Sequence, residues 1–122
     1  MMFEPIHTYL LSQHGAVEEY PFMPEVPVYK VGGKMFAFGS PSETPPKITI
    51  KLDPLHGQML RSTYEAVQAG YHMNKEHWNT IILDGSIPEE ELLSLLDESY
   101  WLVFSSLPQR VRAQFPGGAD SS

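Results

Sequence analysis

Residues 28–38 read Val-Tyr-Lys-Val-Gly-Gly-Lys-Met-Phe-Ala-Phe, and this stretch decides the fold class. Two runs rich in β-branched and aromatic residues flank Gly32-Gly33. Both glycines can adopt the positive φ that a two-residue type I′ hairpin loop requires. The pattern therefore predicts an antiparallel hairpin in which Val28 to Val31 pairs with Lys34 to Phe38.

The two-residue period of a strand assigns the two faces of this hairpin. In a regular register Val31 lies opposite Lys34, Lys30 opposite Met35, and Tyr29 opposite Phe36. One face then carries four large apolar side chains: Tyr29, Val31, Phe36 and Phe38. We expect this face to pack on the core, because burial of large apolar area stabilises the fold. The other face carries Val28, Lys30, Met35 and Ala37.

A further strand follows the proline-rich loop at residues 41–46. Residues 47–52 alternate strictly, with Ile48, Ile50 and Leu52 predicted to face inward and Lys47, Thr49 and Lys51 outward. The sequence thus places Lys30, Lys47 and Lys51 on one outer sheet face.

The remaining segments read as helices and a second strand pair. Apolar residues recur at helical spacing over residues 2–14, Asp53-Pro54 is an N-cap followed by proline, and residues 67–71 and 78–83 read as strands. The run Ser86-Ile87-Pro88-Glu89 resembles a capping box before a long apolar stripe that Pro108 ends.

The element order is then helix, three or four strands, helix, two strands, helix. It predicts an α+β fold of two layers, with helices packed on one face of an antiparallel sheet and the other face partly open.

Length and composition limit the classes of protein. A chain of 122 residues forms one domain, which we assign to residues 1–110, with 111–122 as a loose C-terminal tail. The absence of cysteine excludes disulfides, thiolate catalysis and cysteine zinc sites. No apolar run could span a bilayer and the N-terminus lacks secretory-signal features, so we expect a cytoplasmic protein without membrane contact.

Charge is distributed unevenly along the chain. The net charge of −7 disfavours nucleic-acid binding over the whole surface. Residues 27–51 nevertheless hold four lysines against one glutamate, whereas residues 84–98 hold six carboxylates and no base. The candidate basic patch consists of Lys30, Lys34, Lys47, Lys51 and Lys75. The alternative is an ordinary solvated sheet face, on which lysines discourage edge-to-edge pairing.

The segment between the last two predicted strands is dense in polar side chains. Its candidate ligand-binding residues are His72, Asn74, His77, Trp78 and Asn79. They could recognise a phosphate, a base edge or a peptide, with Trp78 as a stacking surface. Alternatively the two asparagines bond the backbone of a turn and Trp78 fills the core. The five-residue spacing of the two histidines, with no third ligand, predicts neither a metal nor a cofactor.

Residues 28–37 and 70–80, together with Ser99-Tyr100 and Leu107-Pro108, resemble the MmcQ/YjbR family over about residues 3–110. The resemblance implies a two-layer fold similar to type III secretion chaperones and frataxin-like (CyaY-like) proteins. It also implies a family described as DNA-binding with a double-wing motif.

Our leading hypothesis is therefore a noncatalytic domain of unknown function that binds DNA weakly and in a salt-sensitive manner, through the lysine-bearing sheet face and the 72–79 loop. A protein-binding, chaperone-like adaptor is the alternative. An enzyme that uses His72, Lys75 and His77 on a small molecule is a third class.

Overall fold

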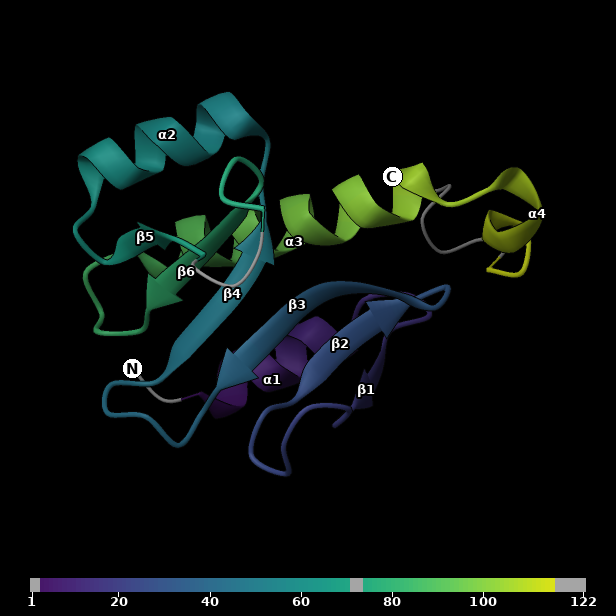
Figure 1. Cartoon of the computed structure of the whole chain (residues 1–122), viewed down its shortest axis with the longest axis horizontal. Helices are drawn as coiled ribbons and strands as arrows, with labels where there is room; N and C mark the ends of the chain where they lie inside the picture. The colour runs from purple at the N-terminus through teal and green to yellow at the C-terminus, as the bar shows by residue number, and fades with distance from the viewer. Residues whose placement is uncertain (1–2, 71–73, 116–122) are drawn as a thin grey trace.

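Antiparallel strands form one six-stranded sheet in the computed structural model, which describes residues 3–70 and 74–115. Their spatial order is β1-β2-β3-β4-β6-β5, seen in Figure 1. The strands are β1 (Val17–Glu19), β2 (Val28–Val31), β3 (Lys34–Ser40), β4 (Lys47–Lys51), β5 (Val67–Ala69) and β6 (Trp78–Ile82). The predicted hairpin is β2–β3. The alternating segment after it is β4.

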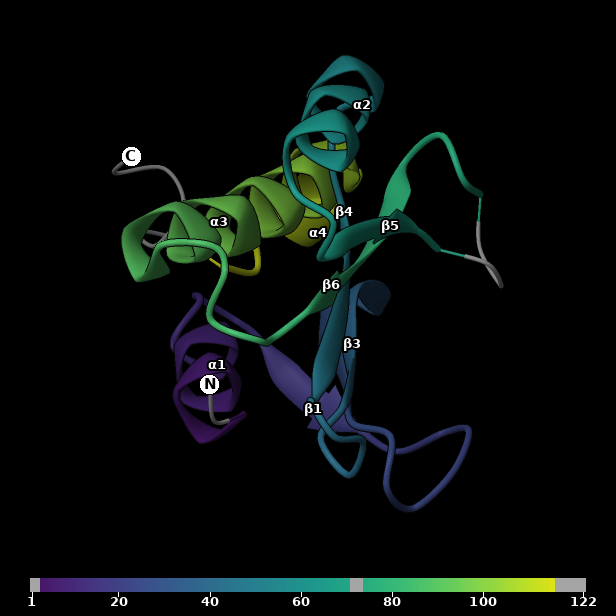
Figure 2. The ribbon, with the colours of Figure 1, turned by 90° about the vertical axis from the view of Figure 1, so that its left-hand side faces the viewer.

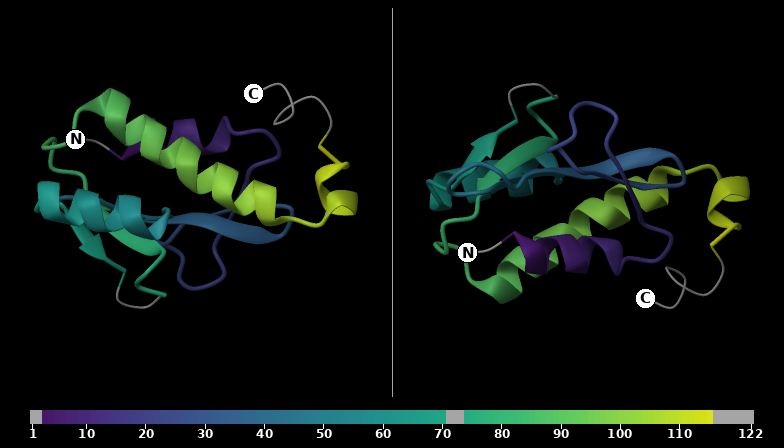
Figure 3. Two further views of the ribbon diagram at one scale, coloured as in Figure 1. Left: turned by 90° about the horizontal axis from the view of Figure 1, so that it is seen from above. Right: turned by 90° about the horizontal axis from the view of Figure 1, so that it is seen from below.

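The helices lie on one face of this sheet. They are α1 (Glu4–Leu11), α2 (Pro54–Thr63), α3 (Glu89–Ser106) and the short α4 (Gln109–Arg112). Figures 2 and 3 show α1 and α3 side by side on this face, with α2 at the β5–β6 end. The α+β class with helices on one face is confirmed. Among the described residues, no helix combines the length and apolarity needed to cross a membrane.

The core lies between α3 and the central strands. The inward side chains of β4, Ile48 and Ile50, are fully buried, as predicted. From α3, Tyr100 meets the ring of Phe36 edge-on at 5.4 Å and stacks on Phe104. Contacts of this kind hold the long helix across β2, β3 and β4.

The predicted hairpin register is wrong beyond the first two residue pairs, although Tyr29, Val31 and Phe36 do lie on the core side as predicted. Val31 pairs with Lys34 and Lys30 with Met35, but Tyr29 pairs with Ala37, because a β-bulge inserts one extra residue, Phe36. Phe36 and Ala37 consequently both lie buried on the helix face.

The bulge also moves Phe38 to the opposite face, where it is half-buried opposite Thr49. The carbonyl of Phe36, released from the strand ladder, accepts a hydrogen bond from the Ser99 hydroxyl of α3 at 2.5 Å. That hydroxyl accepts in turn from the N–H of Lys51 at 2.8 Å. Ser99 therefore ties the bulge and the end of β4 to the helix.

The helix starts differ in their capping. Asp53 caps α2 as predicted, accepting from the N–H groups of Leu55 and His56 at 3.2 and 3.4 Å. The predicted capping box at Ser86 is wrong, because α3 begins at Glu89 after Pro88 without a side-chain cap.

The orientation of α2 follows from Gly57, not from its apolar residues. A Cβ on Gly57 would lie 3.0 Å from the Asn79 amide nitrogen, so the missing side chain lets the helix approach β6 there. Gly57 and Leu60 face the sheet, and Leu55 and Met59 are 75% and 57% exposed.

Part of the predicted C-terminal tail is ordered. Val111 packs over Gly32 in the β2–β3 turn, and the ring of Phe115 packs over Gly15. Both glycines have positive φ. The chain is thus packed on the domain to residue 115, and residues 116–122 lie outside the described part.

Candidate functional site

The sheet face away from the helices, which we call the open face, carries the three lysines that the sequence placed together. In the observed register Lys30 of β2 and both Lys47 and Lys51 of β4 point to this side. Figure 1 looks onto the open face, with α1 and α3 behind the sheet. These lysines therefore lie on the same side of the sheet, on two strands that β3 separates.

Two of these lysines are paired with glutamates. The Lys30 ammonium lies 3.0 Å from the carboxylate of Glu19 in β1, and that of Lys47 lies 3.2 Å from the carboxylate of Glu43. Lys51 makes no ion pair within residues 3–70 and 74–115. Exposed pairs stabilise by less than about 1 kcal/mol, but they neutralise most of the positive charge on this face.

The other two candidate lysines lie elsewhere. Lys34 pairs with Val31, whose side chain is in the core, so Lys34 belongs to the helix-bearing side of the hairpin tip. The register thus places Lys34 on the other side of the sheet from Lys30. Lys75 is exposed in the connection between β5 and β6. Figure 2 shows this connection projecting from the open side of the sheet.

The candidate ligand loop is largely a structural turn. The side-chain oxygen of Asn74 accepts a hydrogen bond from the N–H of Glu76 at 2.9 Å. The backbone carbonyl of Asn74 accepts a second one from the N–H of Trp78, also at 2.9 Å. Asn79 is fully buried. It accepts from the Arg61 guanidinium of α2 and donates to the His77 carbonyl.

Trp78 is only 9% exposed, and His77 is half-buried. His72 lies outside the described residues. The turn thus uses both asparagines internally, and Asn79 is inaccessible to a ligand.

A cluster of exposed apolar residues next to the open face was missed by sequence reasoning. Phe22 and Met23 are 65% and 51% exposed in the connection between β1 and β2, whereas Tyr20, which is 50% exposed, bonds Glu18 on the helix side of the sheet. We call residues 20–23 the apolar loop. In Figure 2 it projects from the open side of the sheet. Val17 of β1, which pairs with Lys30, is also half-exposed. The signal was present in the sequence, where three large apolar residues stand among prolines in a segment read only as irregular.

A polar cluster on the helix side was also missed. The His7 Nδ1 lies 2.7 Å from the hydroxyl of Tyr29, and its Nε2 lies 3.9 Å from Glu18. Burial, followed by the negative charge of Glu18, raises the pKa of the Tyr29 phenol well above its usual range. The neutral phenol is held at the contact of α1 with β2, where it joins the helix to the sheet.

None of these clusters has the arrangement that metal binding needs. No group of three or more histidines or carboxylates is positioned to hold a metal within the described part of the chain. The described residues place exposed apolar side chains and lysines at a sheet face that no described helix covers.

Comparison with known proteins connects this geometry to a family. A model of the YjbR family matches residues 11–102. The chain is 37% identical over 91 residues to the uncharacterized protein YbdF of Escherichia coli O157:H7, covering 75% of each chain. It is 30% identical over 112 residues to the uncharacterized protein YjbR of Escherichia coli K12, covering 92% of this chain and 95% of the relative.

Solved structures agree with this relationship. The crystal structure of a Deinococcus radiodurans protein with a DUF419 domain superposes with a TM-score of 0.87 at 31% identity, over 96% of this chain and 94% of the other. A Pseudomonas syringae crystal structure gives 0.72 at 26% identity, over 84% and 98%. The two Escherichia coli relatives are described as uncharacterized, so they add no activity to the fold. The matched family model and the near full-length relatives show that this chain belongs to the YjbR family.

Proposed function

We propose that this chain is a noncatalytic binding domain that contacts another polypeptide through the open face and the apolar loop. The observation that carries the proposal is the exposure of Phe22 and Met23 beside a sheet face that no described helix covers. Contiguous exposed apolar patches are uncommon on monomers, and aromatic residues and methionine are enriched at protein interfaces.

The apolar loop is also stiff. Pro21 and Pro24 fix φ at two positions within the segment from Tyr20 to Pro24. A loop with fewer accessible conformations loses less entropy when it binds, so more of its contact energy appears as affinity. This rigidity supports a binding role for side chains that contribute little to the fold.

The charges on the open face indicate the kind of polypeptide that fits. Lys51 lies on this face without a carboxylate partner in the described chain, and Lys30 and Lys47 each hold an exposed glutamate that a partner's carboxylate can replace. A partner segment with apolar side chains and one or more carboxylates matches this surface.

Nucleic acid is the second candidate, because Lys30, Lys47 and Lys51 do share one uncovered face. The two ion pairs and the net charge of −7 make it the weaker one. If all three lysines neutralised phosphates, affinity would fall about 40-fold between 50 and 200 mM salt.

Selection of displayed peptides on the purified protein tests the proposal. We expect enrichment of apolar, acidic peptides whose affinity falls about tenfold or more in the double variant Phe22→Ser, Met23→Ser. The double variant Leu55→Ser, Met59→Ser is the matched control, because it removes an equally exposed apolar pair from α2. Peptides that bind both double variants as well as wild type would contradict the proposal.

Fluorescence anisotropy with labelled DNA and RNA at 50 mM salt tests the second candidate. Binding that Lys51→Glu abolishes and that Phe22→Ser, Met23→Ser leaves unchanged would replace the polypeptide proposal with a nucleic-acid function. Absence of binding at this salt concentration would remove the nucleic-acid candidate.

A further inference from the structure

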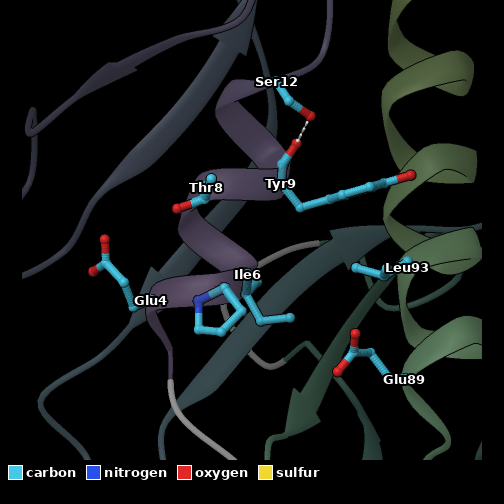
Figure 4. Close-up of a pocket in the computed structure, with 8 residues that line it drawn as sticks. Glu4, Ile6, Thr8, Tyr9, Ser12, Glu89 and Leu93 are labelled. Carbon is cyan, nitrogen blue, oxygen red and sulfur yellow. Dashed lines mark hydrogen bonds between the residues drawn. The ribbon is translucent and has the colours of Figure 1, made fainter.

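A groove runs between α1 and α3 on the side of the molecule away from the open face. It has a volume of about 840 Å³, and Figure 4 shows the side chains around it. Both helices contribute, with Tyr9 reaching from α1 toward α3 and Leu93 reaching from α3 toward α1.

The inner surface of the groove is apolar. Ile6 is buried at its base, Tyr9 and Leu93 are half-buried, and Pro5 is exposed at one wall. At a rise of about 1.5 Å per residue, the eight residues of α1 make a wall about 12 Å long. That length matches about two turns of a further helix laid between α1 and α3.

The charged groups that line the groove are acidic. Glu4 and Glu89 line it and are exposed. Asp97, two turns after Glu89 on α3, accepts hydrogen bonds from the Tyr9 hydroxyl and the Gln13 amide, both at 2.8 Å. Both donors are neutral groups.

Among the described residues, no cation pairs with these carboxylates. No lysine or arginine lines the groove, and the three carboxylates make no ion pair within the described residues. A site with an apolar base and uncompensated carboxylates is complementary to a segment with apolar side chains flanked by bases.

We infer that this groove docks a basic amphipathic helix of a partner protein. Apolar side chains three or four positions apart on the partner pack over Ile6, Tyr9 and Leu93, and flanking lysines or arginines face Glu4 and Glu89. This is the helix-in-groove mode of peptide recognition. It does not rest on the proposed function, since it uses the other face of the molecule and the opposite sign of charge.

The test is a selection of displayed helical peptides, followed by anisotropy measurements with the purified full-length chain. The blocking variant is Thr8→Arg, because Thr8 lines the groove and is exposed, so the change adds bulk and positive charge without disturbing the core. We expect selected peptides to carry a basic polar face and to lose about tenfold or more in affinity for Thr8→Arg. Unchanged thermal unfolding of Thr8→Arg verifies that the loss is local.

Glu89→Gln and Glu90→Gln form the matched pair for charge. Both residues are exposed in the first turn of α3, but only Glu89 lines the groove. Glu89→Gln removes one partly exposed ion pair with the peptide, so the affinity for basic peptides should fall about threefold. Glu90→Gln should lower this affinity less.

Several results would overturn the inference. They are failure to enrich basic helices, binding that Thr8→Arg leaves unchanged, and equal losses in the two glutamine variants. Self-association in sedimentation experiments that Thr8→Arg abolishes would also overturn it, because it would assign the groove to a second copy of this chain.

Discussion

The two sides of the sheet expose apolar side chains in different settings. On the open side, the apolar loop stands beside Lys30, Lys47 and Lys51. On the helix side, the groove between α1 and α3 combines Ile6, Tyr9 and Leu93 with Glu4 and Glu89. The difference indicates that a protein with a net charge of −7 can place lysines on one side of its sheet and unpaired carboxylates beside an apolar groove on the other.

The bulge in β3 places Phe36 and Phe38 on opposite sides of the sheet. Substitution of these residues gives the largest expected effect on stability. Phe36→Ala should destabilise the fold by about 3–5 kcal/mol, because Phe36 is fully buried against Tyr100. Phe38→Ala should cost less than about half as much, since Phe38 is half-buried on the open face. Urea unfolding measures both values.

The regular hairpin register would make the two phenylalanines equivalent. Equal losses for Phe36→Ala and Phe38→Ala would therefore contradict the observed register. If Phe36→Ala is unfolded without denaturant, the pair Phe36→Leu and Phe38→Leu gives the same ranking.

Ser99 connects the helix layer to the sheet and gives the next largest effect. Ser99→Ala leaves the carbonyl of Phe36 and the N–H of Lys51 without their partner in a buried site, so we expect a loss of about 2–3 kcal/mol in the free energy of unfolding. Ser94→Ala is the control, because its exposed hydroxyl bonds only the Glu91 carbonyl of its own helix. If Ser99→Ala loses no more free energy of unfolding than Ser94→Ala, the hydrogen bonds of Ser99 do not stabilise the bulge.

The contact of α1 with β2 predicts a dependence on alkaline pH. The folded-state pKa of Tyr29 is raised above its ordinary value of 10.0, chiefly by burial, so its contribution to stability is present below pH 10 and is lost as the pH rises toward the folded-state pKa. The fall in stability between pH 9 and pH 11 should be smaller by about 1 kcal/mol in Tyr29→Phe than in wild type.

Urea unfolding at the two pH values provides this measurement. Tyr20→Phe is the comparison variant, because Tyr20 is half-exposed and its hydroxyl bonds Glu18 at the surface. An identical fall in wild type and Tyr29→Phe would contradict the assignment of a buried neutral phenol.

The lysines of the open face give the smallest effects on stability. Lys30→Ala removes the pair with Glu19, yet the free energy of unfolding should change by less than about 0.5 kcal/mol, because exposed ion pairs contribute little. Lys51→Ala should change the free energy of unfolding by no more than Lys30→Ala does. A loss above about 1 kcal/mol for either variant in thermal or urea unfolding would make these lysines structural residues rather than a binding surface.

The sequence predicted the layers of the fold because alternation and helical spacing are local patterns. Residues 47–52 assigned both faces of β4 correctly, and Gly32-Gly33 located the hairpin turn. Local sequence patterns could not predict the bulge at Phe36, because the extra residue is stabilised by Ser99, which lies 63 positions later in the chain. The rotation of α2 likewise depends on the approach of Gly57 to Asn79.

The candidate site was predictable only in part. Three lysines were placed on one face, but their pairing with Glu19 and Glu43 depends on a neighbouring strand and a loop whose positions are set by tertiary structure. The exposure of Phe22 and Met23 also depends on tertiary structure. If the same loop folded back on the sheet, these two side chains would be buried in the core.

A single NMR titration tests most directly whether the two sides are separate binding surfaces. Amide shifts of the full-length chain are followed with the selected acidic apolar peptide and, separately, with the selected basic helix. We predict that the first peptide shifts the apolar loop and the open-face strands β1 to β4, and that the second shifts α1 and the first half of α3. Overlapping sets of shifted amides for the two peptides would contradict the account.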